Sequence, residues 1–153
     1  MSAVPKETTG FRPMNEQDLP GIIALERDIY PFPWTLGNFR DSLSAGYSCW
    51  VYARDSHIVG YAVMMVAVGE AHLLNLGIAR AWQRRGIGRQ FMQHLFQVAQ
   101  DHRATSMFLE VRPSNGPAQR LYHSLGFRDI ATRKKYYPAE HGREDAIMMA
   151  RHL

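Results

Sequence analysis

The sequence predicts an α/β protein of the mixed α+β type, in which helices cover the faces of one sheet. Some segments alternate apolar and polar residues with period two, which is typical of strands, and others repeat apolar residues with the helical period. The two kinds follow one another in the order β-α-α-β-β-β-α-β-α-β-β. With 153 residues, 46% of them apolar, the chain has the size of one domain. We expect that domain over residues 10–153, after a flexible N-terminal tail at residues 1–9.

The first half of the chain predicts two helices enclosed by strands. Residues 15–18 (NEQD) form a helix-start signature. Pro31 and Pro33 must end the first helix, because proline cannot continue it. Thr35 is placed to cap a second helix, and residues 55–57 (DSH) form a hairpin turn. In chain order the expected elements are a strand at 11–14, helices at 15–29 and 35–44, and strands at 47–53 and 58–68.

The second half alternates strands with two longer amphipathic helices. Residues 113–117 (PSNGP) are rich in capping and turn residues, and Gly126 is typical of a helix C-terminus. Between the last two strands lies a tyrosine-, proline- and glycine-containing loop. In chain order the expected elements are a strand at 71–78, a helix at 86–102, a strand at 107–112, a helix at 118–125 and strands at 127–133 and 145–149.

Composition limits the function classes. The net charge of +4 and the pI near 9.5 permit an anionic partner without naming one. The longest apolar run, residues 61–68, is far below the ~20 residues that span a bilayer, so we expect no membrane association. A single cysteine, Cys49, forms no internal disulfide and is typical of a core residue, which favours a cytoplasmic location. The seven histidines show no metal-ligand spacing, so we expect no metal.

The stretch QRRGIGR at residues 83–89 lies between a predicted strand and a predicted helix. The N-terminus of a helix presents unpaired N–H groups and partial positive charge, so it binds anions. Gly86 and Gly88 allow close backbone approach to a phosphate, and three arginines add charge: Arg84, Arg85 and Arg89. The same residues are equally compatible with a solvated loop. Neither a nucleotide P-loop nor a dinucleotide fingerprint fits, because no Gly-Lys-Ser/Thr follows and position 91 is phenylalanine.

Taken with other motifs, this turn resembles the Gcn5-related N-acetyltransferase (GNAT) family. The family's Gln/Arg-x-x-Gly-x-Gly/Ala turn matches Gln83 to Gly88 in sequence and in context. The resemblance covers residues 11–150, and within the family it is to enzymes that acetylate the N-terminal alanine of a small-subunit ribosomal protein. One departure is Ile78-Ala79-Arg80, where members often have Val-x-Pro. The other matching stretches are FPW (32–34), AHLLNLGI (71–78), LEVRPSNGPAQRLYHSLGF (109–127), RKKYYP (133–138) and GREDAIMMA (142–150).

The resemblance implies a twisted, mostly antiparallel sheet of about six to seven strands with helices on both faces. It also implies acetyl-coenzyme A as cosubstrate. The pyrophosphate would bind at Arg84, Arg85, Gly86, Ile87, Gly88 and Arg89, and the pantetheine arm at Leu76, Gly77 and Ile78. Asn115 caps the next helix and, by resemblance, also touches the cofactor.

Two residues are candidates for proton transfer. Glu110 is the one acid in an apolar strand, where partial burial would make it a better base near neutral pH. Alone, the pattern equally fits a solvated carboxylate or one paired with Arg112. Tyr122 shares an apolar helix face, which is also typical of a packed core tyrosine. The resemblance assigns Glu110 as general base and Tyr122 as the acid that protonates the departing thiolate.

Aromatic residues are candidates for the acceptor site. Trp34 would form one wall of a peptide slot, and Tyr136 and Tyr137 the other. Because neighbouring residues in a strand point to opposite faces, we expect only one of the two tyrosines to face substrate.

We therefore expect a monomeric enzyme that transfers acetyl from acetyl-coenzyme A to the N-terminal peptide of a ribosomal protein, with no need for direct nucleic-acid binding. One alternative is a GNAT enzyme for other protein N-termini, lysines or small amines. A second is a non-catalytic ribosome- or RNA-binding domain that uses Arg84, Arg85, Arg89 and Lys134-Lys135 on phosphates.

Overall fold

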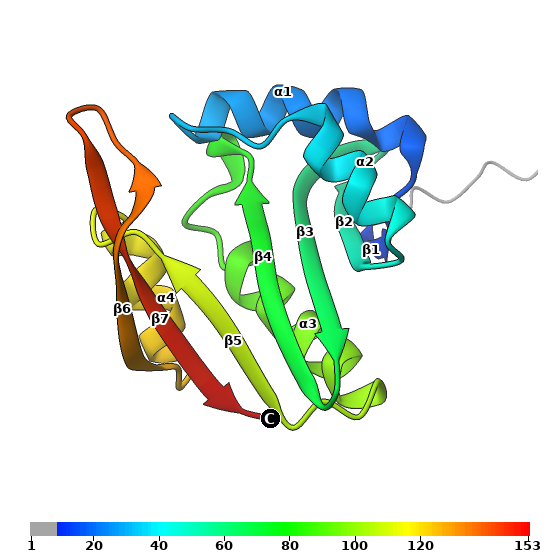
Figure 1. Cartoon of the computed structure of the whole chain (residues 1–153). Coiled ribbons are helices and arrows are strands. Elements are labelled where there is room, and N and C mark those ends of the chain that lie inside the picture. Colours follow the sequence, from blue (N-terminus) through cyan, green and yellow to red (C-terminus); the bar gives the residue numbers. More distant parts are fainter. Residues whose placement is uncertain (1–8) are drawn as a thin grey trace, which may run out of the picture.

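A computed structural model describes residues 9–153, so the expected tail falls almost wholly outside the described residues. The chain forms one seven-stranded sheet of order β1-β2-β3-β4-β5-β7-β6 (Figure 1). All neighbouring strands are antiparallel except β4 and β5, which are parallel. The strands are β1 (Gly10–Pro13), β2 (Ser48–Arg54), β3 (His57–Ala67), β4 (Glu70–Ile78), β5 (Ser106–Val111), β6 (Arg128–Pro138) and β7 (Arg143–His152).

Four α-helices cover the two faces of this sheet. They are α1 (Leu19–Ile29), α2 (Leu36–Ser44), α3 (Ile87–Asp101) and α4 (Gly116–Ser124), and two short 3₁₀ helices, η1 (Glu16–Asp18) and η2 (Arg80–Trp82), precede α1 and α3. One core packs α3 and α4 on the sheet, and the other packs α1 and α2. Strand β3 serves both, since Ala62 faces the first core and Tyr61 the second. The predicted fold class and element order are confirmed.

Helix starts follow the capping residues that the sequence contains. Asn15 and Thr35 each form a capping box, the first on η1 and the second on α2. Asn115 caps α4, its side chain accepting a hydrogen bond from Ala118 N at 3.2 Å. Each cap bonds a residue at most three positions away in the chain, so it can be predicted from the local sequence. None of the helices within residues 9–153 has the length and apolar character needed to cross a membrane.

The last hairpin is longer than the sequence predicted. Strand β6 continues to Pro138 and β7 begins at Arg143, so the RKKYYP segment is a strand and not a loop. The pairing is interrupted between Arg133 and Tyr137, where the register shifts. Because of this bulge, residues 133–138 lack the regular alternation of apolar and polar residues from which a strand is predicted.

Strands β4 and β5 part in the middle of the sheet. They pair only from Glu70↔Ser106 to Leu73↔Leu109, and beyond that point they diverge (Figure 1). At the same level β4 contains a bulge, because Val63 pairs with Asn75 while Met64 pairs with Leu73. Leu74 is the extra residue. Beyond Leu73 and Leu109, the backbone groups of β4 and β5 that face each other are therefore not paired between these two strands.

Candidate active site

The predicted cofactor turn lies at the end of β4 and leads into α3. Gly86 is the N-cap of α3 and has a left-handed conformation with φ of +80°. Among the described residues no side chain caps this helix, so its first N–H groups remain open to an anion. An added Cβ at Gly86 would meet no atom within 4 Å, so the glycine is required by backbone conformation and not by space.

The arginines of the turn have partners of their own. Arg85 stacks over the Trp82 ring at 4.8 Å, and Arg54 does the same at 4.8 Å. Arg89 Nη2 donates to Ser124 Oγ at 2.6 Å, which ties α3 to α4. A Cβ on Gly88 would lie 3.3 Å from Leu121 of α4, so this glycine also serves helix packing. Arg85 and Arg89 therefore place positive charge near the N-terminus of α3, and their contacts with Trp82 and Ser124 restrict where their side chains lie.

Three side chains hold the end of β4 in place. Gly77 packs against Tyr61 so closely that a Cβ would lie 2.3 Å from the phenol ring. The carbonyl of Leu76 accepts a hydrogen bond from the Tyr30 hydroxyl, and that of Ile78 accepts one from Gln83 Nε2 at 2.9 Å. The segment proposed for the pantetheine arm thus has a defined backbone orientation.

A groove of about 290 Å³ lies beside the parting of β4 and β5. It brings together four of the predicted residues: Glu110, Trp34, Tyr136 and Tyr137. Its other lining residues are His72, Leu73, Leu74, Phe108, Leu109, Arg133 and Met148. A separate cavity of about 360 Å³, next to Met14, Cys49 and Trp50, contains none of the candidate residues. We take the smaller groove as the candidate active site because it holds the carboxylate.

Glu110 lies in this groove with its side chain 24% exposed. Its Oε1 is 3.4 Å from Arg133 Nε, on the neighbouring hairpin. The alternative partner considered from the sequence, Arg112, pairs with Glu144 instead, at 3.0 Å. Glu110 is therefore neither a core residue nor a freely solvated one, and its partner comes from a segment the sequence pattern did not indicate.

Tyr136 and Tyr137 do not lie on opposite faces, although the alternation of a regular strand predicts that they do, and which of them contacts the acceptor stays a prediction. Both tyrosines line the groove, with ring centroids 4.9 Å apart and planes at 75°. Lys135, just before them, has a left-handed φ of +52°, and the register of β6 shifts in this bulge. The twist breaks the alternation of side chains that a regular strand would impose. Burial, and next the Glu110 carboxylate, raise the pKa of Tyr137 to about 12.

Tyr122 is buried on α4, its ring 5.7 Å from that of Phe127. Burial raises the pKa of its phenol well above the ordinary value, and the nearby Tyr137 raises it further. The hydroxyl is therefore protonated at neutral pH, as a proton donor must be. Packing in the core and this protonation state are compatible, so both roles considered from the sequence remain open.

Glu26 is a residue whose importance the sequence reasoning missed. It is 2% exposed, although it lies among the apolar residues of α1. Its carboxylate accepts hydrogen bonds from Tyr61 Oη at 2.7 Å, Trp34 N at 2.9 Å and Asn75 Nδ2 at 3.0 Å. It thus joins the α1–α2 loop to the bulged strand β4. The sequence does contain an indication of this role, because Glu26 is an acidic residue on the otherwise apolar face of a helix, and buried acids normally have partners.

No group of three or more potential metal ligands occurs among residues 9–153. Cys49 is buried in the core beneath α1 and α2, as predicted, and burial raises the pKa of its thiol to about 11.

Comparison with known proteins agrees with this geometry. The model of the acetyltransferase (GNAT) family matches residues 19–127. The [ribosomal protein bS18]-alanine N-acetyltransferase of Escherichia coli K12 (RimI) is 35% identical over 133 residues, which is 87% of this chain and 90% of that protein. Its counterpart in Salmonella typhimurium is 35% identical over 137 residues, 90% of this chain and 93% of that protein.

Solved structures extend the comparison. The crystal structure of the E. coli ribosomal-protein-S18-alanine N-acetyltransferase has a TM-score of 0.89 at 32% identity, covering 95% of this chain and 94% of that one. NAA60 of Arabidopsis thaliana in complex with acetyl-CoA has a TM-score of 0.86 at 20% identity, covering 95% and 99% of the two chains, which shows a shared fold. The chain therefore belongs to the acetyltransferase (GNAT) family, and it is an acetyl-coenzyme A-dependent N-acetyltransferase.

Proposed function

We propose that this enzyme acetylates the N-terminal alanine of the small-subunit ribosomal protein bS18, with Glu110 as general base and Tyr122 as general acid. The observation that carries the proposal is the groove, which joins Glu110 to three aromatic residues beside the open end of β4. Relatives named for this reaction are 35% identical over most of the chain.

The acceptor enters as an α-ammonium group, whose ordinary pKa is about 7.7–8.0. Glu110 accepts its proton, directly or through a water molecule, and the neutral amine forms a C–N bond with the acetyl carbon. Backbone N–H groups near the Leu74 bulge are suited to polarise the thioester carbonyl. Tyr122 donates its proton to the sulfur as the C–S bond breaks. The amide nitrogen loses its second proton to solvent, Glu110 releases to solvent the proton it accepted, and the phenol regains one proton from solvent, so the reaction releases one proton overall.

The cosubstrate would be held mainly by backbone. The uncapped N-terminus of α3 at Gly86, Ile87 and Gly88 fits a pyrophosphate. Arg84, Arg85 and Arg89 supply charge around it. Leu76, Gly77 and Ile78 would align the pantetheine arm along β4, and Asn115 would add a polar contact while capping α4.

Residues 10–153 are proposed to act as a single domain and as a monomer, in the cytoplasm. The buried cysteine needs no oxidising compartment. Because the chain is an acetyltransferase, a non-catalytic RNA-binding role is set aside. The remaining alternative is a different acceptor: another protein N-terminus, a lysine or a small amine.

A panel of peptides with different N-termini tests the proposal when coenzyme A release is followed. The bS18 N-terminal peptide should be acetylated most efficiently on its α-amine. Glu110→Gln should lower kcat by about 10²–10⁴-fold and leave the KM for acetyl-coenzyme A unchanged. Glu16→Gln, which changes an exposed acid paired with Arg40, is the control and should be fully active. Turnover only on lysine side chains or small amines would contradict the assignment.

A further inference from the structure

The tip of the β6–β7 hairpin extends beyond the rest of the sheet. Pairing between β5 and β7 ends at Val111↔Ile147, whereas β6 and β7 pair with each other as far as Pro138↔Arg143. Within the described residues, the tip thus has no strand beside it except its own partner. Yet Tyr136 and Tyr137, which line the groove, belong to this tip. Something other than the sheet must hold it in place.

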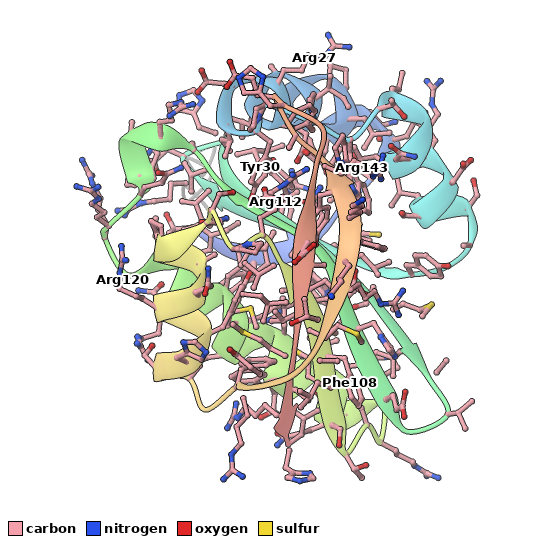
Figure 2. The ribbon with its side chains drawn as sticks, turned by 60° about the vertical axis from the view of Figure 1, so that its left-hand side comes forward. Arg27, Tyr30, Phe108, Arg112, Arg120 and Arg143 are labelled. Carbon is pink, nitrogen blue, oxygen red and sulfur yellow. The ribbon has the colours of Figure 1, made fainter. Side chains whose placement is uncertain are left out.

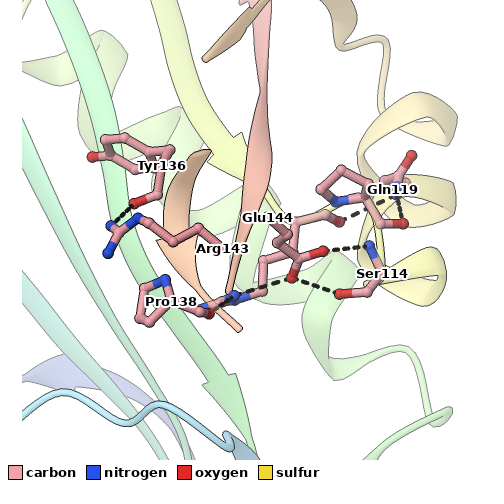
Figure 3. Close-up of polar contacts among 8 residues, drawn as sticks. Ser114, Gln119, Tyr136, Pro138, Arg143 and Glu144 are labelled. Carbon is pink, nitrogen blue, oxygen red and sulfur yellow. Dashed lines mark hydrogen bonds and ion pairs between the residues drawn. The ribbon is translucent and has the colours of Figure 1, made fainter. Parts of the chain in front are cut away.

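Arg112 provides polar contacts to the tip from the end of β5. Its Nη1 donates to Pro138 O at 2.7 Å and to Glu144 Oε1 at 3.0 Å. Glu144 Oε1 also accepts a hydrogen bond from Ser114 Oγ at 2.8 Å, as Figure 3 shows. The two charged side chains are only 22% and 23% exposed, so solvent screens their attraction less than at an open surface.

The charge state of this pair is well defined. Desolvation works against ionisation of Glu144, but the hydrogen bonds from Arg112 and Ser114 outweigh it and hold the pKa of Glu144 below its ordinary value. The pair is therefore an ion pair throughout the neutral range.

The same guanidinium lies over two aromatic rings that come from different segments of the chain. Its Cζ lies 4.3 Å from the centroid of the Tyr137 ring on the hairpin and 5.1 Å from that of Phe32 in the α1–α2 loop. Phe32 is 40% exposed, and this contact accounts for a large apolar ring at the surface. One side chain thus joins the two segments that carry Trp34 and the two tyrosines.

Arg143 makes a different kind of contact. It donates from Nε to Lys135 O at 2.8 Å and from Nη2 to Tyr136 O at 2.7 Å, both within the hairpin. Arg112 directly follows the last residue of β5, whereas Arg143 is the first residue of β7; both are labelled in Figure 2. Arg143 therefore contacts only the hairpin itself, whereas Arg112 connects the hairpin to the end of β5.

We propose that Arg112 is a positioning residue that fastens the β6–β7 tip to the α1–α2 loop and thereby sets the width of the acceptor groove. The inference rests on the proposed use of this groove by the acceptor. Arg112 lies two residues beyond Glu110, so it also couples the position of the tyrosines to the strand that carries the base. Loss of the side chain should impair acceptor binding and leave the cosubstrate turn intact.

Steady-state kinetics with both substrates test this role. Arg112→Met should raise the KM for the acceptor peptide roughly tenfold, because two charge-assisted hydrogen bonds and two ring contacts are lost. The KM for acetyl-coenzyme A should change less than about twofold. Arg112→Lys should be intermediate, since an ammonium keeps the charge but lacks the planar guanidinium that lies over both rings while Nη1 donates to Pro138 O and Glu144 Oε1.

The matched control is Arg12→Met. Arg12 forms a bidentate pair with the buried Asp18, at 2.7 and 2.8 Å, on the β1–η1 side and away from every groove residue. This variant should lose thermal stability without a change in the acceptor KM. An unchanged acceptor KM in Arg112→Met, or a parallel rise of both KM values, would overturn the proposal.

Hydrogen exchange tests the positioning role of Arg112 independently of the proposed identity of the acceptor. In Arg112→Met without any substrate, amides of residues 134–146 should exchange at least tenfold faster, while those of α3 and α4 should be unchanged. Glu144→Gln keeps a hydrogen-bond acceptor and should give a smaller increase, which supplies a second variant if the first folds poorly. If bS18 peptide is not acetylated but the exchange result holds, the acceptor assignment fails and the positioning role stands. Unchanged exchange at the tip sinks the positioning role.

Discussion

The cofactor turn and the acceptor groove are built in opposite ways. The turn at residues 83–89 is one continuous stretch, and its main feature is a backbone conformation at Gly86. The groove is assembled from side chains of β4, β5, β6, β7 and the α1–α2 loop. A turn made of backbone is encoded by neighbouring residues, whereas a groove made of side chains depends on how distant strands are placed.

Both regions contain unusual backbone, but it serves different purposes. In the turn, left-handed Gly86 begins α3 and leaves its first N–H groups open, and we propose that these groups bind the pyrophosphate. In the hairpin, left-handed Lys135 and the adjacent register shift rotate two tyrosines into one groove. The first arrangement makes the backbone the binding group, and the second uses the backbone to aim side chains.

Apart from the change at Glu110, Tyr122→Phe is expected to have the largest effect, because its phenol is proposed to protonate the departing thiolate. Removing the hydroxyl should lower kcat by about 10²-fold with both KM values nearly unchanged, since a positioned proton donor acts in the transition state. Tyr52→Phe is the control, a buried tyrosine of the same core outside both regions. Equal kcat values for the two variants would contradict an acid role for Tyr122.

Gly77→Ala should be the most destabilising change at the strand that separates turn and groove. A Cβ would lie 2.3 Å from the Tyr61 ring, and such overpacking costs about 1–3 kcal/mol or more in the free energy of unfolding. Gly21→Ala on α1, where the nearest atom is 4.0 Å away, should instead be neutral or stabilising. Thermal unfolding of both variants checks the prediction, and a stable Gly77→Ala protein would disprove the packing argument.

Gly86→Ala should affect the turn alone. A left-handed alanine costs about 1–2 kcal/mol, so the KM for acetyl-coenzyme A should rise roughly tenfold while the acceptor KM stays unchanged. Gly46→Ala imposes a similar backbone penalty, with φ of +76° and open space around it, far from the turn in sequence. It should reduce stability without changing the cosubstrate KM. A rise in the acceptor KM of Gly86→Ala would show that the two regions are coupled.

The smallest expected effect is a loss of stability at low pH that originates in α3, the helix that follows the turn. His94 of α3 stacks on Phe11 at 4.4 Å, and burial lowers its pKa. Its buried Nε2 has no hydrogen-bond partner within residues 9–153. The unfolded chain therefore binds this proton more readily, so stability is complete above the ordinary pKa of about 6.5 and decreases as pH falls below it. Urea unfolding at pH 7.5 and 5.5 should show this loss, and His94→Phe should reduce it. An identical loss in His94→Phe would exclude His94 as the source.

Much of the fold followed from the residues because its signals are local. Capping by Asn15, Thr35 and Asn115 was confirmed, as were the fold class and the position of the turn between β4 and α3. The assignment of Glu110 and Tyr122 as base and acid stays a prediction. The structure adds that Glu110 lies in a groove and that the Tyr122 phenol is protonated at neutral pH.

The errors and omissions lie where contacts are distant in sequence. Arg112 was considered as a partner of Glu110 because the two are neighbours on one strand, yet it reaches Glu144 and Glu110 reaches Arg133. The alternation of a regular strand predicts that Tyr136 and Tyr137 point to opposite faces. Because β6 has a bulge at this point, both side chains line the groove. Each of these outcomes depends on strand register, which a single chain pattern does not specify.

The sequence by itself determined the element order, the helix caps and a backbone turn fit for a phosphate, since each depends on the conformational preferences of adjacent residues. Only the tertiary structure decided the shape of the acceptor groove. It did so through the parting of β4 and β5, the bulge in β6 and the contacts of Arg112 and Glu26. These features arise when strands and loops far apart in the chain pack together, and their energies reside in contacts between residues that no local pattern connects.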